Sequence, residues 1–127
     1  MINSSNAENP EPAAARQVRL AAGAMAAKKG FDITAYNVSG ISSVTDFYLV
    51  CSAMNAPHLK ALSNDVRQAL KGSGINCWRF SGSQESGWMI ADYVDFIIHF
   101  FKKDVRAYYR VDELWQGVPK LDLNLQP

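Results

Sequence analysis

Apolar residues recur at a helical period in two parts of the chain. In residues 13–29, eight of 17 residues are alanine, and Val18, Ala21, Ala22 and Met25 follow i, i+3, i+4, i+7 spacing. That spacing places the four side chains on one face of a helix, and alanine is the best helix former. We therefore predict a first helix over residues 13–29.

A second helix is expected after Asn55, whose side chain can cap it, with Pro57 in its first turn. Its apolar stripe runs over three turns, and Gly72 and Gly74 mark its end. The stripe consists of Leu59, Leu62, Val66 and Leu70.

Other segments show the alternating or continuous apolar pattern of strands. Residues 46–52 and 94–101 are apolar on both faces, which is typical of strands inside a sheet. The five expected strands are residues 32–37, 46–52, 76–81, 87–93 and 94–101.

A last helix is predicted over residues 103–115, with Asp104 as its cap. The side chains expected to face the core are Val105, Tyr108, Tyr109 and Leu114.

The resulting order, α-β-β-α-β-β-β-α, indicates an α+β (α/β-like) fold with a mixed five-stranded sheet and packed helices. We expect one domain over residues 13–116. Residues 1–12 are expected to form a flexible N-terminal tail, and residues 117–127 a loose C-terminal tail that can contact a partner.

Composition narrows the function classes. The chain has 127 residues, 48% hydrophobic, and a net charge of +1. Basic residues are scattered, which argues against direct nucleic-acid binding and favours a protein partner. Cys51 and Cys77 are read as reduced core thiols. No run spans a bilayer and no signal peptide is seen, so we expect a cytoplasmic protein without membrane contact.

Catalytic motifs are weak. The sequence has neither a Gly-x-Ser-x-Gly elbow nor a phosphate-binding loop. His58 falls on the polar face of its helix, and His99 is interpreted as a hydrogen-bonded core histidine. Asp92 and Asp95 are candidate ligands for a metal ion, as in a metal-dependent nucleotidyltransferase, but no third carboxylate accompanies them. We expect no cofactor, no metal and no enzymatic activity.

Strand parity suggests a binding surface. Trp88, Ile90 and Asp92 alternate with Met89, Ala91 and Tyr93, so the two sets face opposite ways. Trp88, Asp92, Tyr93 and Asp95 are nevertheless expected to cluster at one hairpin end. Aromatic residues ringed by carboxylates are typical of protein-docking patches. The alternative is that the aromatic residues belong to the core and the carboxylates form the turn.

Four motifs, in order and over roughly residues 13–116, resemble the RsfS/Iojap family of ribosomal silencing factors. They are Thr45-Asp46-Phe47-Tyr48-Leu49-Val50, His58-Leu59-x-Ala61-Leu62, the hairpin Gly87 to Phe101, and Arg106-x-Tyr108-Tyr109-Arg110-x-x-x-Leu114-Trp115. The resemblance implies a nucleotidyltransferase-like fold without catalytic residues.

The resemblance also implies a function. Family members bind ribosomal protein L fourteen on the large subunit, block its association with the small subunit and so repress translation. Their docking residues correspond to Trp88, Asp92, Tyr93 and Asp95. The alternatives are a nucleotidyltransferase, a large-subunit assembly factor, or a scaffold that forms a homodimer in the free state.

The chain also departs from the family pattern. Ser52-Ala53-Met54 replaces a usual Gly-Thr-Ser, and Ser81-Gly82 replaces Glu-Gly. Val94 stands where the family has glycine, so a positive φ at this position would strain the turn.

Overall fold

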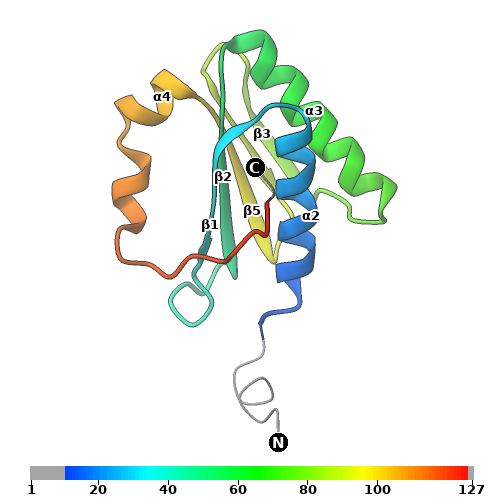
Figure 1. The fold of residues 1–127 in the computed structure, drawn as a ribbon, viewed down its shortest axis with the longest axis vertical. Helices are drawn as coiled ribbons and strands as arrows, with labels where there is room; N and C mark the ends of the chain where they lie inside the picture. The colour runs from blue at the N-terminus through cyan, green and yellow to red at the C-terminus, as the bar shows by residue number, and fades with distance from the viewer. Residues whose placement is uncertain (1–10, 126–127) are drawn as a thin grey trace, which may run out of the picture.

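The computed structural model describes residues 11–125, so most of the predicted N-terminal tail, residues 1–10, lies outside the described residues. Five strands, three α-helices and a short 3₁₀ helix make up this part of the chain (Figure 1). In chain order they are α2 (Ala14–Ala27), β1 (Phe31–Asn37), β2 (Phe47–Ala53), α3 (Ala56–Gly72), β3 (Arg79–Ser83), β4 (Trp88–Asp92), β5 (Phe96–Lys102), α4 (Lys103–Tyr108) and η1 (Val111–Trp115).

The strands form one mixed sheet in the order β1-β2-β5-β4-β3. β2 and β5 pair in parallel, whereas the other three neighbouring pairs are antiparallel. The last three strands form an antiparallel meander, and the predicted place of the last strand inside the sheet is confirmed. The fold is therefore the mixed five-stranded α+β architecture that the sequence predicts.

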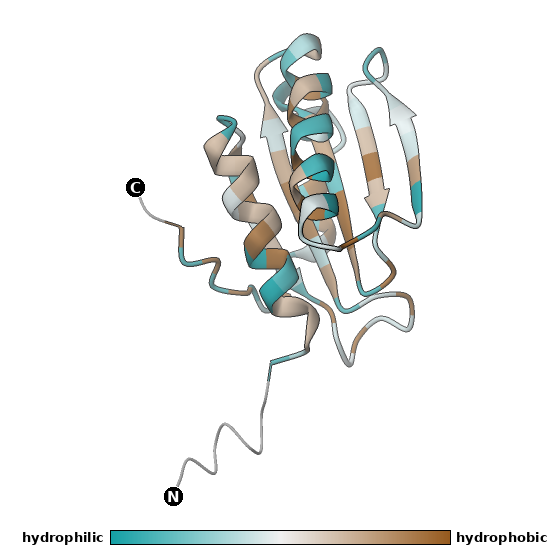
Figure 2. Ribbon diagram, turned by 90° about the vertical axis from the view of Figure 1, so that its right-hand side faces the viewer, coloured by the Kyte–Doolittle hydropathy of each residue, from teal (hydrophilic) through white to brown (hydrophobic). Residues whose placement is uncertain are grey.

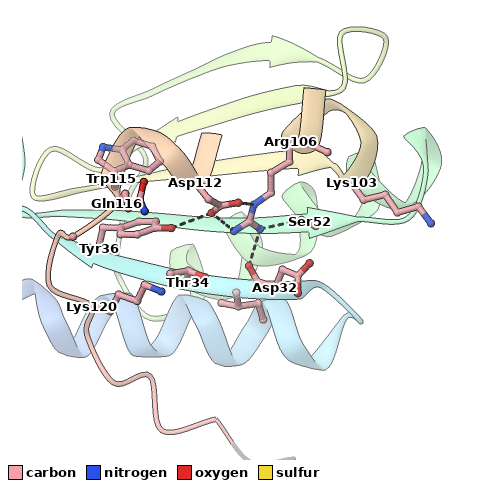
Figure 3. Close-up of a pocket in the computed structure, with 13 residues that line it drawn as sticks. Asp32, Thr34, Tyr36, Ser52, Lys103, Arg106, Asp112, Trp115, Gln116 and Lys120 are labelled. Carbon is pink, nitrogen blue, oxygen red and sulfur yellow. Dashed lines mark hydrogen bonds and ion pairs between the residues drawn. The ribbon is translucent and has the colours of Figure 1, made fainter. Parts of the chain in front are cut away.

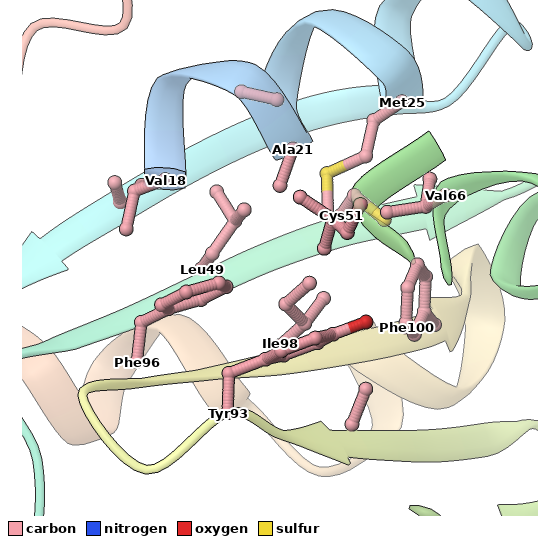
Figure 4. Close-up of a cluster of buried hydrophobic side chains, with 14 of the residues drawn as sticks. Val18, Ala21, Met25, Leu49, Cys51, Val66, Tyr93, Phe96, Ile98 and Phe100 are labelled. Atoms are coloured by element: carbon pink, nitrogen blue, oxygen red, sulfur yellow. The ribbon is translucent and has the colours of Figure 1, made fainter. Parts of the chain in front are cut away.

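Helices α2 and α3 cover one face of the sheet, and Figure 2 shows them in front of it with hydrophilic residues on the outer side of α3. The capping prediction is confirmed, since Asn55 Oδ1 accepts a hydrogen bond of 2.9 Å from the His58 backbone N–H. The predicted stripe is fully buried (Leu59, Leu62, Val66 and Leu70). It packs with α2 and with alternate residues of β2, β4 and β5 in the main core (Figure 4).

The opposite face of the sheet is covered only in part, by α4 and η1, which Figure 1 shows on the other side from α2 and α3. Val50, Phe101 and Val111 are buried there in a second, smaller core. None of the helices in residues 11–125 is long and apolar enough to cross a membrane.

The predicted helix 103–115 is wrong in its length. Arg110 adopts a left-handed conformation with φ of 53°, which ends α4 and starts η1. Tyr108, Tyr109 and Leu114, expected in the core, are 79%, 57% and 71% exposed. The break at Arg110 moves Leu114 off the face predicted for a continuous helix, whereas Tyr108 and Tyr109 precede the break and lie exposed at the end of α4 itself. Asp104 is not the cap either, because that position is Lys102.

The chain after Gly117 runs along the free edge of β1 instead of extending loosely. The Asn37 N–H donates to Pro119 O at 2.7 Å, and the Leu121 N–H donates to Ala35 O at 2.9 Å. Leu121 and Leu123 pack against the main core. This segment thereby shields an edge strand that would otherwise be open to pairing.

Val94 has a φ of 72° in the turn between β4 and β5. A β-branched residue is strained in this left-handed region by about 1–2 kcal/mol, because its Cβ crowds the carbonyl oxygen. The positive φ that would strain a valine in place of the family's glycine is therefore present at Val94.

We expect Val94→Gly to raise the free energy of unfolding by about 0.5–1 kcal/mol, the strain released less the entropy cost of glycine. The melting temperature should rise by roughly 2–4 °C in thermal unfolding. Val44→Gly is the matched control, because Val44 is also an exposed loop valine but has no positive φ. An equal rise in both variants would show that strain at Val94 is not the cause.

Candidate functional site

The parity predicted for β4 and β5 is confirmed. Met89 and Ala91 of β4 are buried in the main core, while Trp88, Ile90 and Asp92 are half-buried on the opposite face. On β5, Ile97 and His99 share that opposite face, since Ile97 pairs with Asp92 and His99 pairs with Ile90. We call this surface, made of Trp88, Ile90, Asp92, Ile97 and His99, the open face.

Aromatic packing fixes Trp88 at one end of the open face. Its ring lies 4.9 Å from the ring of Phe101 and 5.9 Å from that of Tyr109, measured between centroids. Its indole N–H donates a 3.1 Å hydrogen bond to His99 Nδ1. The indole is thus held in one orientation while part of it stays accessible, as a rigid contact residue requires.

Both histidines have structural partners. The predicted hydrogen bond of His99 is confirmed, but its side chain is half-buried on the open face and not in the core. Burial lowers the pKa of His99 to about 4. His58 Nδ1 accepts from the Met54 N–H at 3.0 Å, and its Nε2 lies 2.9 Å from Lys28 O. His58 therefore ties α3 to the end of α2.

The lowered pKa of His99 predicts a pH-dependent stability. Below the ordinary histidine pKa of about 6.5, His99 is protonated in the unfolded chain but stays neutral in the folded chain until the pH approaches its lowered pKa. The free energy of unfolding should fall by about 2–3 kcal/mol between about pH 7 and pH 4.5, measured by urea unfolding. His99→Gln should remove most of this fall and His58→Gln should retain it. An undiminished fall in His99→Gln would contradict the assignment.

The four predicted docking residues do not form one cluster. Trp88 and Asp92 share a face but occupy opposite ends of β4, roughly 13 Å apart along the strand. Tyr93 follows on the other face, where it is 7% exposed and stacks on Phe96 at 4.8 Å (Figure 4). The predicted cluster at the hairpin end is therefore wrong, because the alternation of side chains along each strand places these residues on different faces.

The turn after β4 is built by its carboxylate. Asp92 Oδ1 accepts a 2.8 Å hydrogen bond from the Val94 N–H, so this side chain does form the turn, as the alternative reading held. Asp95 is exposed, and its backbone carbonyl accepts from the Asp46 N–H at 3.1 Å. The turn thus presents one free carboxylate beside the open face.

Within residues 11–125, no three His, Cys, Asp or Glu side chains are grouped to hold a metal ion.

A polar junction that sequence reasoning missed joins β1, β2, α4 and η1. Arg106 is 6% exposed and forms a two-point contact with Asp112, through Nε at 3.0 Å and Nη2 at 2.8 Å (Figure 3). Its Nη1 donates to Asp32 O at 2.7 Å and to Ser52 Oγ at 2.9 Å. Arginine in an amphipathic helix is normally exposed, so the pattern of apolar and polar residues does not predict that Arg106 is buried.

The Arg106 junction borders a cavity of about 510 Å³. The Arg106 guanidinium holds the pKa of Asp112 below its usual value. Tyr36, whose hydroxyl donates to Asp112 at 3.0 Å, has its pKa raised to about 12, mainly by burial. These groups satisfy one another, so the junction holds η1 against the sheet.

Comparisons with known proteins agree with the fold. Residues 10–127 match the family model described as ribosomal silencing factor during starvation. The chain is 32% identical to "Ribosomal silencing factor RsfS" of Halalkalibacterium halodurans over 106 residues, and 32% identical to that of Bacillus subtilis over 107 residues. Each alignment covers 84% of this chain and 91% of the relative.

Two crystal structures are similar to this chain. The structure of a Bacillus halodurans protein gives a TM-score of 0.73 at 31% identity, covering 84% of this chain and 97% of that one. The structure of a Chromobacterium violaceum protein gives a TM-score of 0.75 at 28% identity, and the alignment covers 87% of this chain and 92% of that one. Sequence and fold agree with the resemblance found from the motifs: this chain belongs to the ribosomal silencing factor family, RsfS.

Proposed function

We propose that this protein binds the large ribosomal subunit through ribosomal protein L fourteen and sterically blocks its association with the small subunit, so that translation is repressed. Family membership supports the ribosomal role. The open face is the observation that carries the choice of surface. It presents an oriented tryptophan and apolar side chains on the sheet side that α2 and α3 leave uncovered.

The contact would combine an apolar centre with an acidic rim. Trp88, Ile90 and Ile97 supply the apolar surface, and aromatic residues of this kind dominate the binding energy of protein interfaces. Asp92 and Asp95 lie at the far end and select a basic partner, the charge that ribosomal proteins carry to bind RNA. The mechanism is occupancy of a surface, with no chemical step and no cofactor.

Tyr93 has a different role from the one expected. Its ring is buried behind the turn, so it supports the backbone between Asp92 and Asp95 instead of touching a partner. The proposed contact residues are therefore Trp88, Asp92 and Asp95, with Tyr93 as a positioning residue.

Co-sedimentation with separated ribosomal subunits tests the proposal. The protein should pellet with large subunits and not with small subunits, in a cytoplasmic ionic background. Pelleting with neither subunit would contradict it. The same face would serve a homodimer in the free state, and in that case dilution of the protein should increase the fraction that binds.

A further inference from the structure

A second cavity lies on the side of the sheet away from the open face. It has a volume of about 300 Å³ and is formed by the C-terminal half of α3, the loop that follows α3, and Tyr93. Two cations line it, Arg67 and Lys71. In residues 11–125, no Asp or Glu side chain lines this cavity, and although the charge of Asp92 reaches the lining residue Cys77, the two cations outnumber it.

Two buried donors at this cavity lack partners. Neither the Tyr93 hydroxyl nor Arg67 Nε hydrogen-bonds to any of the residues that the structure describes. Tyr93 is more than nine-tenths buried, and it lines the same cavity as Arg67. Buried polar groups are nearly always paired, so two neighbouring donors without acceptors point to a ligand that accepts hydrogen bonds.

Arg67 is held in place before any ligand arrives. Its guanidinium lies over the Phe80 ring, 3.7 Å from the centroid, and its Nη2 donates to Asn64 Oδ1 at 2.8 Å. Burial raises the pKa of Tyr93 to about 12, so its hydroxyl keeps its proton and acts as a donor at neutral pH. The preorganised guanidinium loses little freedom when it binds an anion.

The remaining lining groups fit the same ligand class. Gln68 and Asn76 bring amide donors from α3 and from the loop. Cys77 also lines the cavity, and burial raises the pKa of its thiol, so it adds no negative charge at neutral pH. The donors approach from three segments of the chain, which suits a ligand with several oxygens better than a planar carboxylate with two.

We propose that this cavity binds a phosphate-type oxyanion, either free phosphate or the phosphate of a small monoester, through Arg67, Lys71 and Tyr93. The cavity lies on the opposite side of the sheet from the open face, and although Tyr93 also supports the turn between Asp92 and Asp95, anion binding does not depend on the ribosomal role.

Titration of the ¹⁵N-labelled full chain with inorganic phosphate, at constant ionic strength set with potassium chloride, tests the proposal by NMR. Saturable shifts are expected for residues at the cavity. Tyr93→Phe and Lys71→Gln should each weaken binding by roughly tenfold, as expected for the loss of one hydrogen bond to a charged ligand. Lys60→Gln is the control, because it removes the same charge from an exposed position near the start of α3.

Tyr93→Phe also separates binding from folding. It removes only an unpaired hydroxyl, so its melting temperature without phosphate should equal or exceed that of the wild type. Phenyl phosphate is the second probe. Binding of phosphate alone assigns the free anion, and binding of both assigns a monoester site. Shifts that grow linearly without saturation, or unchanged affinity in both variants, would overturn the proposal.

Discussion

Replacing Arg106 by methionine is expected to lower the free energy of unfolding by about 3 kcal/mol, the largest effect on stability that we predict for a single substitution. The change removes the Arg106 donors from the Asp112 carboxylate, the Asp32 carbonyl and the Ser52 hydroxyl, and Asp112 then keeps only the hydrogen bond from the Tyr36 hydroxyl. Breaking a buried ion pair typically costs about 3–5 kcal/mol, and the partial exposure of Asp112 places the expected value at the low end.

Urea unfolding at neutral pH measures this loss. Arg110→Met is the matched control, since Arg110 is 76% exposed and its ion pair with Glu113, at 3.9 Å, is weak. We expect a change of less than about 0.5 kcal/mol there. Equal losses in the two variants would mean that the Arg106 junction does not hold η1 against the sheet.

The second large effect concerns binding. Trp88→Ala should weaken binding to the large subunit by about 2–4 kcal/mol, or roughly 30- to 1,000-fold, because a central aromatic contact carries much of an interface's energy. Binding of the labelled protein to purified large subunits, followed by fluorescence anisotropy, gives the affinity directly.

Trp78→Ala provides the comparison. Trp78 is 62% exposed, lies just before β3, packs with Arg79, and is not one of the open-face residues. The Trp78→Ala variant should bind the large subunit with the same affinity as the wild type. Because Trp88 also packs on Phe101, the melting temperature of each variant must be measured, and binding compared well below it. Equal affinities of the two folded variants would show that Trp88 is not a contact residue.

The elements with strong periodicity could be predicted from the sequence. The α3 stripe, the Asn55 cap and the alternation in β4 and β5 all follow from local spacing, and the structure confirms them. Each signal involves residues only a few positions apart, where helix and strand geometry alone decide which side chains share a face.

Features that depend on contacts between distant residues were missed. The burial of Arg106, on α4, depends on Ser52 of β2 and Asp32 of β1. The C-terminal segment is ordered by β1, far away in the sequence. Arg110 adopts a left-handed conformation that cannot be predicted from its residue type.

The error at Tyr93 has a different source. Strand parity had already placed its side chain on the face opposite Trp88, but proximity in the sequence and the family resemblance grouped the two residues. The cavity beside Tyr93 carries no local sequence signal, because Arg67, Asn76 and Tyr93 come from three separate segments.

The most direct test of the ribosomal role is a subunit-joining measurement. Purified large and small subunits are mixed with increasing amounts of the protein, and light scattering follows the formation of whole ribosomes. The wild type and Trp78→Ala should reduce joining in proportion to the occupied large subunits, whereas Trp88→Ala should leave joining unchanged at the same concentration. Undiminished joining on large subunits saturated with the wild-type protein would contradict steric silencing.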